Sequence, residues 1–107
     1  MINIDFLVLN TGDLIGFEIK GHSGLAENGQ DILCAAVSSA AYMTVNTISD
    51  VIKVNSDIKV DDKGFLSLII NDSDCLSCRD ILLGFKIHML ALEEQYPGNI
   101  TVNYTEV

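Results

Sequence analysis

Residues 21–38, GHSGLAENGQDILCAAVS, join a glycine-rich loop to the start of a long apolar helix, with a cysteine close to that start. Asp31 is among the best residues for a helix N-cap, because its carboxylate accepts hydrogen bonds from the free N–H groups of the first turn. A helix capped there would hold Cys34 at its third position. The free N–H groups and partial positive charge of a helix N-terminus stabilise a thiolate, the reactive form of cysteine. This run therefore predicts both a helix and a reactive thiol.

A histidine stands at the other end of the same loop. His22 follows an alternating apolar segment, so the chain delivers His22 from a strand end and Cys34 from a helix start. Gly21, Gly24 and Gly29 give the loop the freedom to move and to bring the imidazole to the thiol. Taken singly, His22 is typical of a surface loop and Cys34 of a buried, inert cysteine. Together they favour the nucleophile and general base of a cysteine protease.

Two further polar side chains lie close to this pair in the sequence. Asp31 has two candidate roles, capping the helix or orienting His22 through a ring nitrogen as a triad acid does, and capping is favoured. Ser38 lies one helical turn beyond Cys34, where its hydroxyl is a candidate to bond either a polar neighbour of the site or the carbonyl one turn earlier. Backbone N–H groups at the helix start, that of Cys34 included, are candidates for an oxyanion hole.

The same run resembles the active-site signature of the ribosomal-processing cysteine protease family, Prp. That signature is a Gly-His pair, a glycine-containing loop, and Gly-x-Asp-Ile-hydrophobic-Cys-Ala-Ala-Val-Ser. Gly21-His22 and then Gly29 to Ser38 match it, with Ser23 where alanine is frequent and Leu33 where valine or isoleucine is expected. Neither difference removes a reactive group. Small single-domain members have about the length of this chain.

The resemblance implies a function and partners. Members of the family are homodimeric cysteine proteases that remove a short N-terminal extension from the large-subunit ribosomal protein numbered twenty-seven. The resemblance implies that His22 and Cys34 are catalytic, that the loop between them moves over the bound peptide, and that no cofactor or metal takes part. The extension carries apolar and aromatic residues before the cut, which implies an apolar groove beside Cys34.

Composition limits the alternatives. A chain of 107 residues suits one domain, residues 1–107. Its net charge of −9 argues against nucleic acid as a partner, since phosphate binding needs clustered Lys and Arg. An acidic surface would attract a basic protein partner, but solubility alone also explains it and is the favoured explanation. No apolar run reaches the ~20 residues of a membrane span, and residues 1–5 lack the basic region of a signal peptide. We expect a cytoplasmic protein without membrane contact, where three cysteines stay reduced.

Apolar alternation predicts five strands. Residues 2–8 and 15–19 alternate about a polar turn and read as a hairpin. Residues 58–60 and 65–70 flank Asp-Asp-Lys-Gly and read as a second hairpin, and residues 100–104 alternate again. With two helices between them, the expected order is ββαββαβ. The fold class is therefore α+β, a small sheet packed against two helices.

The two helices have different apolar patterns. The first, from Asp31 to about Lys53, has no strongly polar face, so we expect it to be buried nearly all round, against a partner subunit as well as its own chain. Its main apolar stripe comprises Ile32, Ala36, Ala40, Met43, Thr47 and Val51. The second helix, from about Cys75 to Tyr96, has a core face of Leu82, Phe85, Met89 and Leu92. Gly84 costs this helix ~1 kcal/mol against alanine, which predicts close approach of another element there.

Other interpretations remain open. Cys75 and Cys78 have CxxC spacing near a helix start, but they follow a hairpin late in the chain and match no common zinc site, which favours two incidental cysteines. His88 is typical of a structural histidine. The main rival to a protease is a non-catalytic dimeric acidic module that binds a ribosomal protein. A third hypothesis, a thiol redox protein, would use Cys75 and Cys78 and not Cys34.

Overall fold

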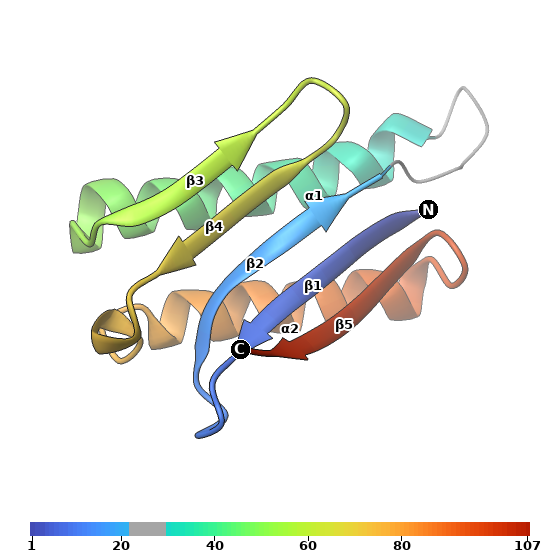
Figure 1. Ribbon diagram of the computed structural model, residues 1–107. Helices are drawn as coiled ribbons and strands as arrows, with labels where there is room; N and C mark the ends of the chain where they lie inside the picture. The colour runs from blue at the N-terminus through green and yellow to red at the C-terminus, as the bar shows by residue number, and fades with distance from the viewer. Residues whose placement is uncertain (22–29) are drawn as a thin grey trace.

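The computed structural model describes residues 1–21 and 30–107. The elements follow the predicted order ββαββαβ, with two short helical segments added (Figure 1). Their bounds are β1 Ile2–Val8, β2 Leu14–Lys20, α1 Gln30–Asn46, η1 Thr47–Ile52, β3 Ser56–Val60, β4 Leu66–Ile70, η2 Asp72–Asp74, α2 Arg79–Gln95 and β5 Ile100–Glu106. The expected hairpins and last strand are thus confirmed.

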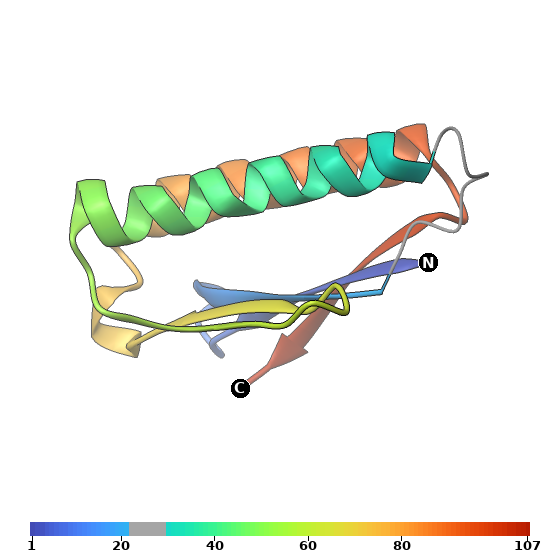
Figure 2. The same ribbon diagram turned by 90° about the horizontal axis from the view of Figure 1, so that it is seen from above.

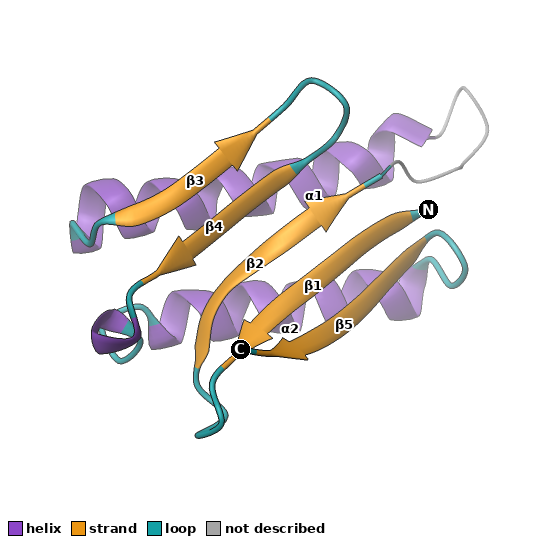
Figure 3. Ribbon diagram, in the orientation of Figure 1, coloured by secondary structure: helices purple, strands orange, loops and turns teal. Residues whose placement is uncertain are grey.

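The strands form one mixed sheet in the order β3-β4-β2-β1-β5 (Figure 3). β1 pairs with β2 and β4 pairs with both β2 and β3 in antiparallel fashion, whereas β5 lies parallel to β1. Gly16 of β2 lies opposite Ile69 of β4, and a Cβ on Gly16 would collide with the carbonyl oxygen of Leu68. A glycine is therefore required for β4 to approach β2 this closely.

Both helices cover the same face of the sheet, which makes a two-layer α+β fold (Figure 2). Alternate residues of the strands point to this face and form the core with one stripe of each helix. Three aromatic rings lie at its centre, with the Phe85 ring 4.5 Å from that of Phe17 and 5.7 Å from that of Phe6 between centroids. The predicted core face of the second helix is confirmed, because Leu82, Phe85, Met89 and Leu92 are all buried.

Within this chain the first helix is covered on one side only, and its burial against a partner subunit stays a prediction. The face of α1 on the sheet carries Leu33, Val37, Ala41 and Val45, whereas three members of the expected stripe are exposed, Ile32 at 63%, Met43 at 56% and Val51 at 75%. The other three, Ala36, Ala40 and Thr47, are half-buried. A sheet covers one side of a helix and a neighbouring helix covers a flank, so a two-layer fold leaves the outer side without cover.

The helix ends also differ from the expected ones. The first helix continues past α1 as the π-helical η1 and ends at Lys53, which has a left-handed φ of 62° and donates its N–H to the carbonyl of Ile48. The second begins at Arg79 and not near Cys75, because η2 and a turn occupy residues 72–78. Gly84 has no atom within 4 Å of where its Cβ would stand, so the expected close approach there is wrong.

Residues Ile32–Ile52 make one continuous helical stretch of 21 residues, long and apolar enough by length and composition to cross a bilayer. No such stretch was expected from the sequence, because polar residues interrupt its apolar runs. Its buried stripe packs on the sheet, and core helices of this kind pass the same test of length and hydropathy. A single helix of this sort is weak evidence for a membrane span.

Candidate active site

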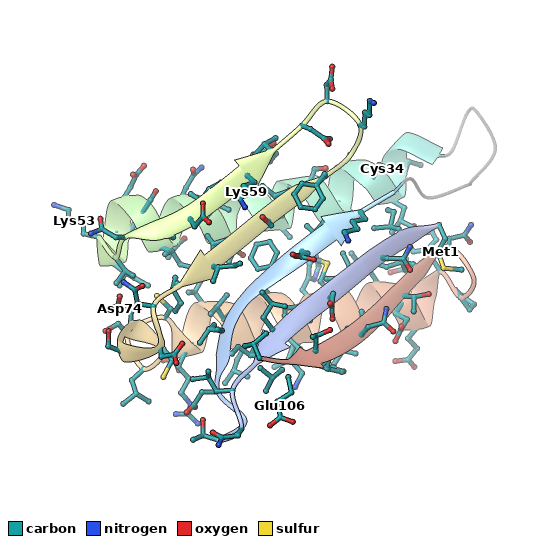
Figure 4. The ribbon with its side chains drawn as sticks, in the orientation of Figure 1. Met1, Cys34, Lys53, Lys59, Asp74 and Glu106 are labelled. Carbon is teal, nitrogen blue, oxygen red and sulfur yellow. The ribbon has the colours of Figure 1, made fainter. Side chains whose placement is uncertain are left out.

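Cys34 lies near the start of α1, at the end of the molecule where β2 ends and β1 begins (Figure 4). Its side chain is half-buried. It opens into a hollow of about 280 Å³ between α1 and the sheet. The residues that share this hollow with Cys34 are Ile2, Ile19, Gly21, Val37, Ser38, Asp62 and Gly64. The thiol therefore faces a space that a substrate can enter, with apolar side chains from three elements around it.

The far wall of the hollow is the turn between β3 and β4, residues 61–65. The Asp61 carboxylate holds this turn, because its Oδ1 accepts hydrogen bonds from the N–H groups of Lys63 at 2.8 Å and Phe65 at 3.1 Å. The N–H of Asp61 also donates to the carbonyl of Phe65 at 3.1 Å. These bonds fix the backbone that carries Asp62 and Gly64 opposite Cys34.

A second hollow, of about 220 Å³, adjoins the first. Both are lined by Ile19, Ser38 and Gly64. Its other lining residues are Tyr42, Val60, Asp61, Phe65 and Leu66, so it lies between α1 and the β3–β4 hairpin. Together the two hollows make a largely apolar groove that begins at Cys34. A groove of this character beside Cys34 is what the resemblance implied, although nothing in the linear sequence placed the hairpin against it.

Several predicted site residues lie outside the described part of the chain. These are His22, Gly24 and Gly29, and the side chain of Asp31 is likewise not described. The mutual geometry of His22 and Cys34 therefore stays a prediction, as does a bond between Asp31 and His22.

The expected position of Asp31 at the helix N-cap is wrong. α1 begins at Gln30, so Asp31 is its second residue and Cys34 its fifth, not its third. In a regular α-helix the N–H of the fifth residue donates to the carbonyl of the first, which leaves the N–H of Cys34 unavailable for an oxyanion hole. The helix N–H groups without a partner inside the helix are those of the first four residues. The Cα–Cβ bond of Cys34 tilts back toward them.

Gly21 and Ser38 are both part of the hollow around Cys34. Gly21 has a φ of +91°, and a Cβ there would collide with the carbonyl oxygen of Met1. A glycine is thus required by the backbone geometry at the point where the chain leaves β2. The Ser38 hydroxyl makes no hydrogen bond in the described part of the chain, whereas Thr44 and Thr47 of the same helical stretch bond back to carbonyls one turn earlier. It is free to bond a ligand.

The CxxC pair lies far from this groove. Figure 4 shows Asp74, the neighbour of Cys75, at the opposite end of the molecule from Cys34. Cys78 is fully buried in the core, and burial raises the pKa of its thiol, with a smaller contribution from Asp74 and Cys75. A buried thiol with a raised pKa is a poor nucleophile. Both cysteines are unpaired.

His88 lies on the outer side of α2, where it is exposed beside Ala36, Ala40 and Met43 of α1. His88 is thus exposed and not buried, and its interpretation as a structural histidine and not a ligand stays a prediction. Within residues 1–21 and 30–107, no three His, Cys, Asp or Glu side chains gather closely enough to hold a metal ion. The chemistry of the described residues centres on Cys34.

Comparison with known proteins agrees with this site. A model of the family described as cysteine protease Prp matches residues 1–101. The chain belongs to the cysteine protease Prp family. The ribosomal processing cysteine protease Prp of Staphylococcus aureus is 30% identical over 105 residues, which are 97% of this chain and 99% of that protein. As a member of the Prp family, the chain is a cysteine protease.

Two crystal structures of Staphylococcus aureus Prp share the fold. One, in complex with a covalently linked product peptide, has a TM-score of 0.89 and 30% identity, and the match covers 98% of this chain and 100% of that one. The other, in complex with a substrate peptide, has a TM-score of 0.86 and 29% identity over the same shares. The five-stranded sheet with two helices is thus a Prp fold.

Proposed function

We propose that this protease removes the short N-terminal extension of the large-subunit ribosomal protein numbered twenty-seven, with Cys34 as nucleophile and His22 as general base. The single observation that carries the proposal is the position of Cys34, half-buried at the head of an apolar groove. The relatives named ribosomal processing cysteine proteases support a ribosomal substrate. The net charge of −9 suits a basic one, because opposite charge speeds encounter.

The proposed reaction runs in two steps. His22 takes the proton of the Cys34 thiol, and the thiolate attacks the scissile carbonyl carbon. The C–N bond then breaks, the amine leaves with the proton from the imidazolium, and the extension stays on sulfur as a thioester. Water, deprotonated by His22, hydrolyses that thioester and restores the thiol. No cofactor enters either step.

Backbone donors near the helix start would stabilise the oxyanion of the tetrahedral intermediates. Removal of one such donor from a protease site typically costs about 10²–10³ in rate. The first four N–H groups of α1 are the available set, since that of Cys34 is used within the helix. Asp31 stays a candidate to orient His22. Ser38 stays a candidate to form a hydrogen bond with the substrate or with a polar neighbour of the site.

The proposal includes a homodimer in the bacterial cytoplasm. The outer face of the first helix exposes Ile32 and Met43 of α1 and Val51 of η1, large apolar side chains that a second copy would cover. A reducing compartment suits the three unpaired cysteines.

The test is incubation of the purified protein with the full-length ribosomal protein that bears its extension, followed by intact-mass analysis. The wild type is expected to release one N-terminal fragment, and Cys34→Ser to release none. Cys75→Ser serves as the matched control and should cut like the wild type. An uncut substrate that co-purifies with the wild type would instead support the non-catalytic binding module. Loss of activity in Cys75→Ser with activity kept in Cys34→Ser would support the redox alternative.

A further inference from the structure

The two cysteines of the CxxC segment share a single helical turn just ahead of α2. The N–H of Cys78 donates to the carbonyl of Asp74 at 3.2 Å, which closes an α-helical turn over residues 74–78. Cys75 has helical dihedral angles, φ −60° and ψ −35°. Residues three apart in such a turn have their Cα atoms about 5 Å from each other. Native disulfides span Cα distances of roughly 4.4–6.8 Å, so this backbone brings the pair within bonding range.

The two thiols lie on the same side of the turn. Cys78 is fully buried and Cys75 packs against the core, whereas the two residues between them, Leu76 and Ser77, are exposed. Burial raises the pKa of the Cys78 thiol, and Asp74 and Cys75 are near enough to add to that rise. The spacing that looked incidental in the linear sequence therefore places two free thiols next to each other in the fold.

Cys75, unlike Cys78, can be reached from solvent. It is half-buried and lines a separate hollow of about 210 Å³ between the β1–β2 turn and the start of α2. The other residues that line this hollow are Thr11, Gly12, Asp13, Leu14, Arg79 and Leu83. A water molecule takes up about 30 Å³, and a small hydroperoxide is only slightly larger, so the hollow admits one. Cysteines that sense oxidants are accessible and have a second thiol at hand, as Cys75 has.

We propose that Cys75 and Cys78 form a redox site separate from the protease site, in which a hydroperoxide oxidises the two thiols to a reversible disulfide. The Cys75 sulfur attacks one oxygen of the hydroperoxide, the O–O bond breaks, and the released oxygen leaves with the thiol proton as water or an alcohol. The Cys78 sulfur then attacks the sulfenic sulfur, the S–O bond breaks, and the hydroxyl group leaves with the Cys78 proton as water. The two sulfurs lose two electrons in all, and the hydroperoxide gains them.

Burial fixes the order of these two steps. Cys78 is closed off from solvent and its raised pKa keeps it protonated, so an external oxidant does not find a reactive thiol there. A sulfenic acid on Cys75 is within its reach, and this proximity compensates for the small thiolate fraction. Cys75 therefore reacts first, and Cys78 reacts only with Cys75.

The experiment uses the full-length chain with Cys34→Ser, whose only thiols are those of Cys75 and Cys78. The folded protein is treated with hydrogen peroxide, unfolded in guanidinium chloride with N-ethylmaleimide, and weighed by intact-mass analysis. Cys75→Ser and Cys78→Ala on the same background are the matched variants, and circular dichroism checks that each is folded. Cys75→Ser changes a half-buried position, so it decides the case even where Cys78→Ala fails to fold.

The chain with both thiols should become lighter by two hydrogen atoms and take up no maleimide, and dithiothreitol should restore both thiols. Cys75→Ser should keep Cys78 reduced through the peroxide treatment and take up one maleimide after unfolding. Cys78→Ala should stop at the sulfenic acid of Cys75, which dimedone traps.

Three outcomes would overturn the inference. Cys78 oxidised as fast in Cys75→Ser as in the parent chain would mean that Cys75 does not relay the oxidation. Addition of two or three oxygen atoms to Cys75, with Cys78 still free, would show that the two sulfurs do not meet. Disulfide-linked dimers on a non-reducing gel, in place of the internal bond, would assign Cys75 to contacts between molecules.

Discussion

A methyl group added at Gly84 is expected to stabilise this protein, and the same group added at Gly16 to destabilise it. Gly84→Ala and Gly16→Ala are the same chemical change in one chain. They differ in surroundings, because the Cβ at Gly84 would meet no atom within 4 Å, whereas the Cβ at Gly16 would collide with the carbonyl oxygen of Leu68. The pair therefore separates the intrinsic effect of the methyl group from the effect of packing.

The gain at Gly84 follows from helix propensity. Gly84 lies inside α2 and is exposed, so alanine there adopts the native conformation without strain. Alanine is favoured over glycine in a helix interior by about 0.8–1.0 kcal/mol. Unfolding entropy near 2.1 cal/mol/K per residue makes 1 kcal/mol worth roughly 4 °C in Tm for a chain of this length.

The loss at Gly16 follows from the close pairing of β2 and β4. The added methyl group must push the strands apart, and overpacking of this kind costs about 1–3 kcal/mol. Weakened ladder hydrogen bonds add about 1 kcal/mol each. We expect a loss of about 2–4 kcal/mol in the free energy of unfolding, and a drop of roughly 10 °C or more in Tm.

Thermal and urea unfolding followed by circular dichroism, at two protein concentrations, measure both variants against the wild type. A stability loss in Gly84→Ala would refute the reasoning, because it would mean that another surface covers the outer side of α2. A neutral Gly16→Ala would show that β4 lies farther from β2 than the structure has it. In that case the hairpin opposite Cys34 would also lie elsewhere.

Three further predictions concern the groove, the thiols and the assembly. Asp61→Ala removes the acceptor that holds the turn opposite Cys34, so it should lower the free energy of unfolding by about 1 kcal/mol and also lower kcat/KM. Asp61→Asn keeps an accepting oxygen and should stay close to the wild type. Thermal melts and cleavage assays measure both variants. Iodoacetamide at pH 7.5 should alkylate the half-buried Cys34 and Cys75 and should reach the buried Cys78 only on unfolding, as peptide mapping would show. A rate at Cys78 equal to theirs would contradict the burial described. Faster alkylation at Cys34 than at Cys75 is expected from the proposed role of Cys34 as nucleophile. Burial raises the pKa of Cys78, so the folded protein holds this proton more tightly than the unfolded chain does. The resulting contribution to stability is present below about pH 8.5, the ordinary pKa of a cysteine, and is lost as pH rises further. Met43→Glu, a charge on the exposed face of α1, should convert the expected dimer to a monomer in light scattering, and a monomeric wild type would rule out that interface.

The sequence by itself determined the order of the elements and the family. Alternating apolar residues specify strands, and a change to helical spacing specifies helices, because both patterns are local. The candidate catalytic pair was also accessible to sequence reasoning, since His22 and Cys34 fall within one run of eighteen residues. The cap assignment was wrong because the helix begins two residues earlier than a cap at Asp31 requires, and helix ends of this kind are not fixed by a local pattern.

Only the tertiary structure decided which face of the first helix is buried and what stands opposite Cys34. No face of that helix is strongly polar, so periodicity does not choose among them, and the choice falls to the sheet and to α2. Asp62 and Gly64 lie 28 and 30 residues beyond Cys34 and carry no signal of a site. They reach the groove because β4 pairs with β2, and that pairing depends on the missing side chain of Gly16. Contacts between distant segments arise from strand pairing, which a local pattern does not specify.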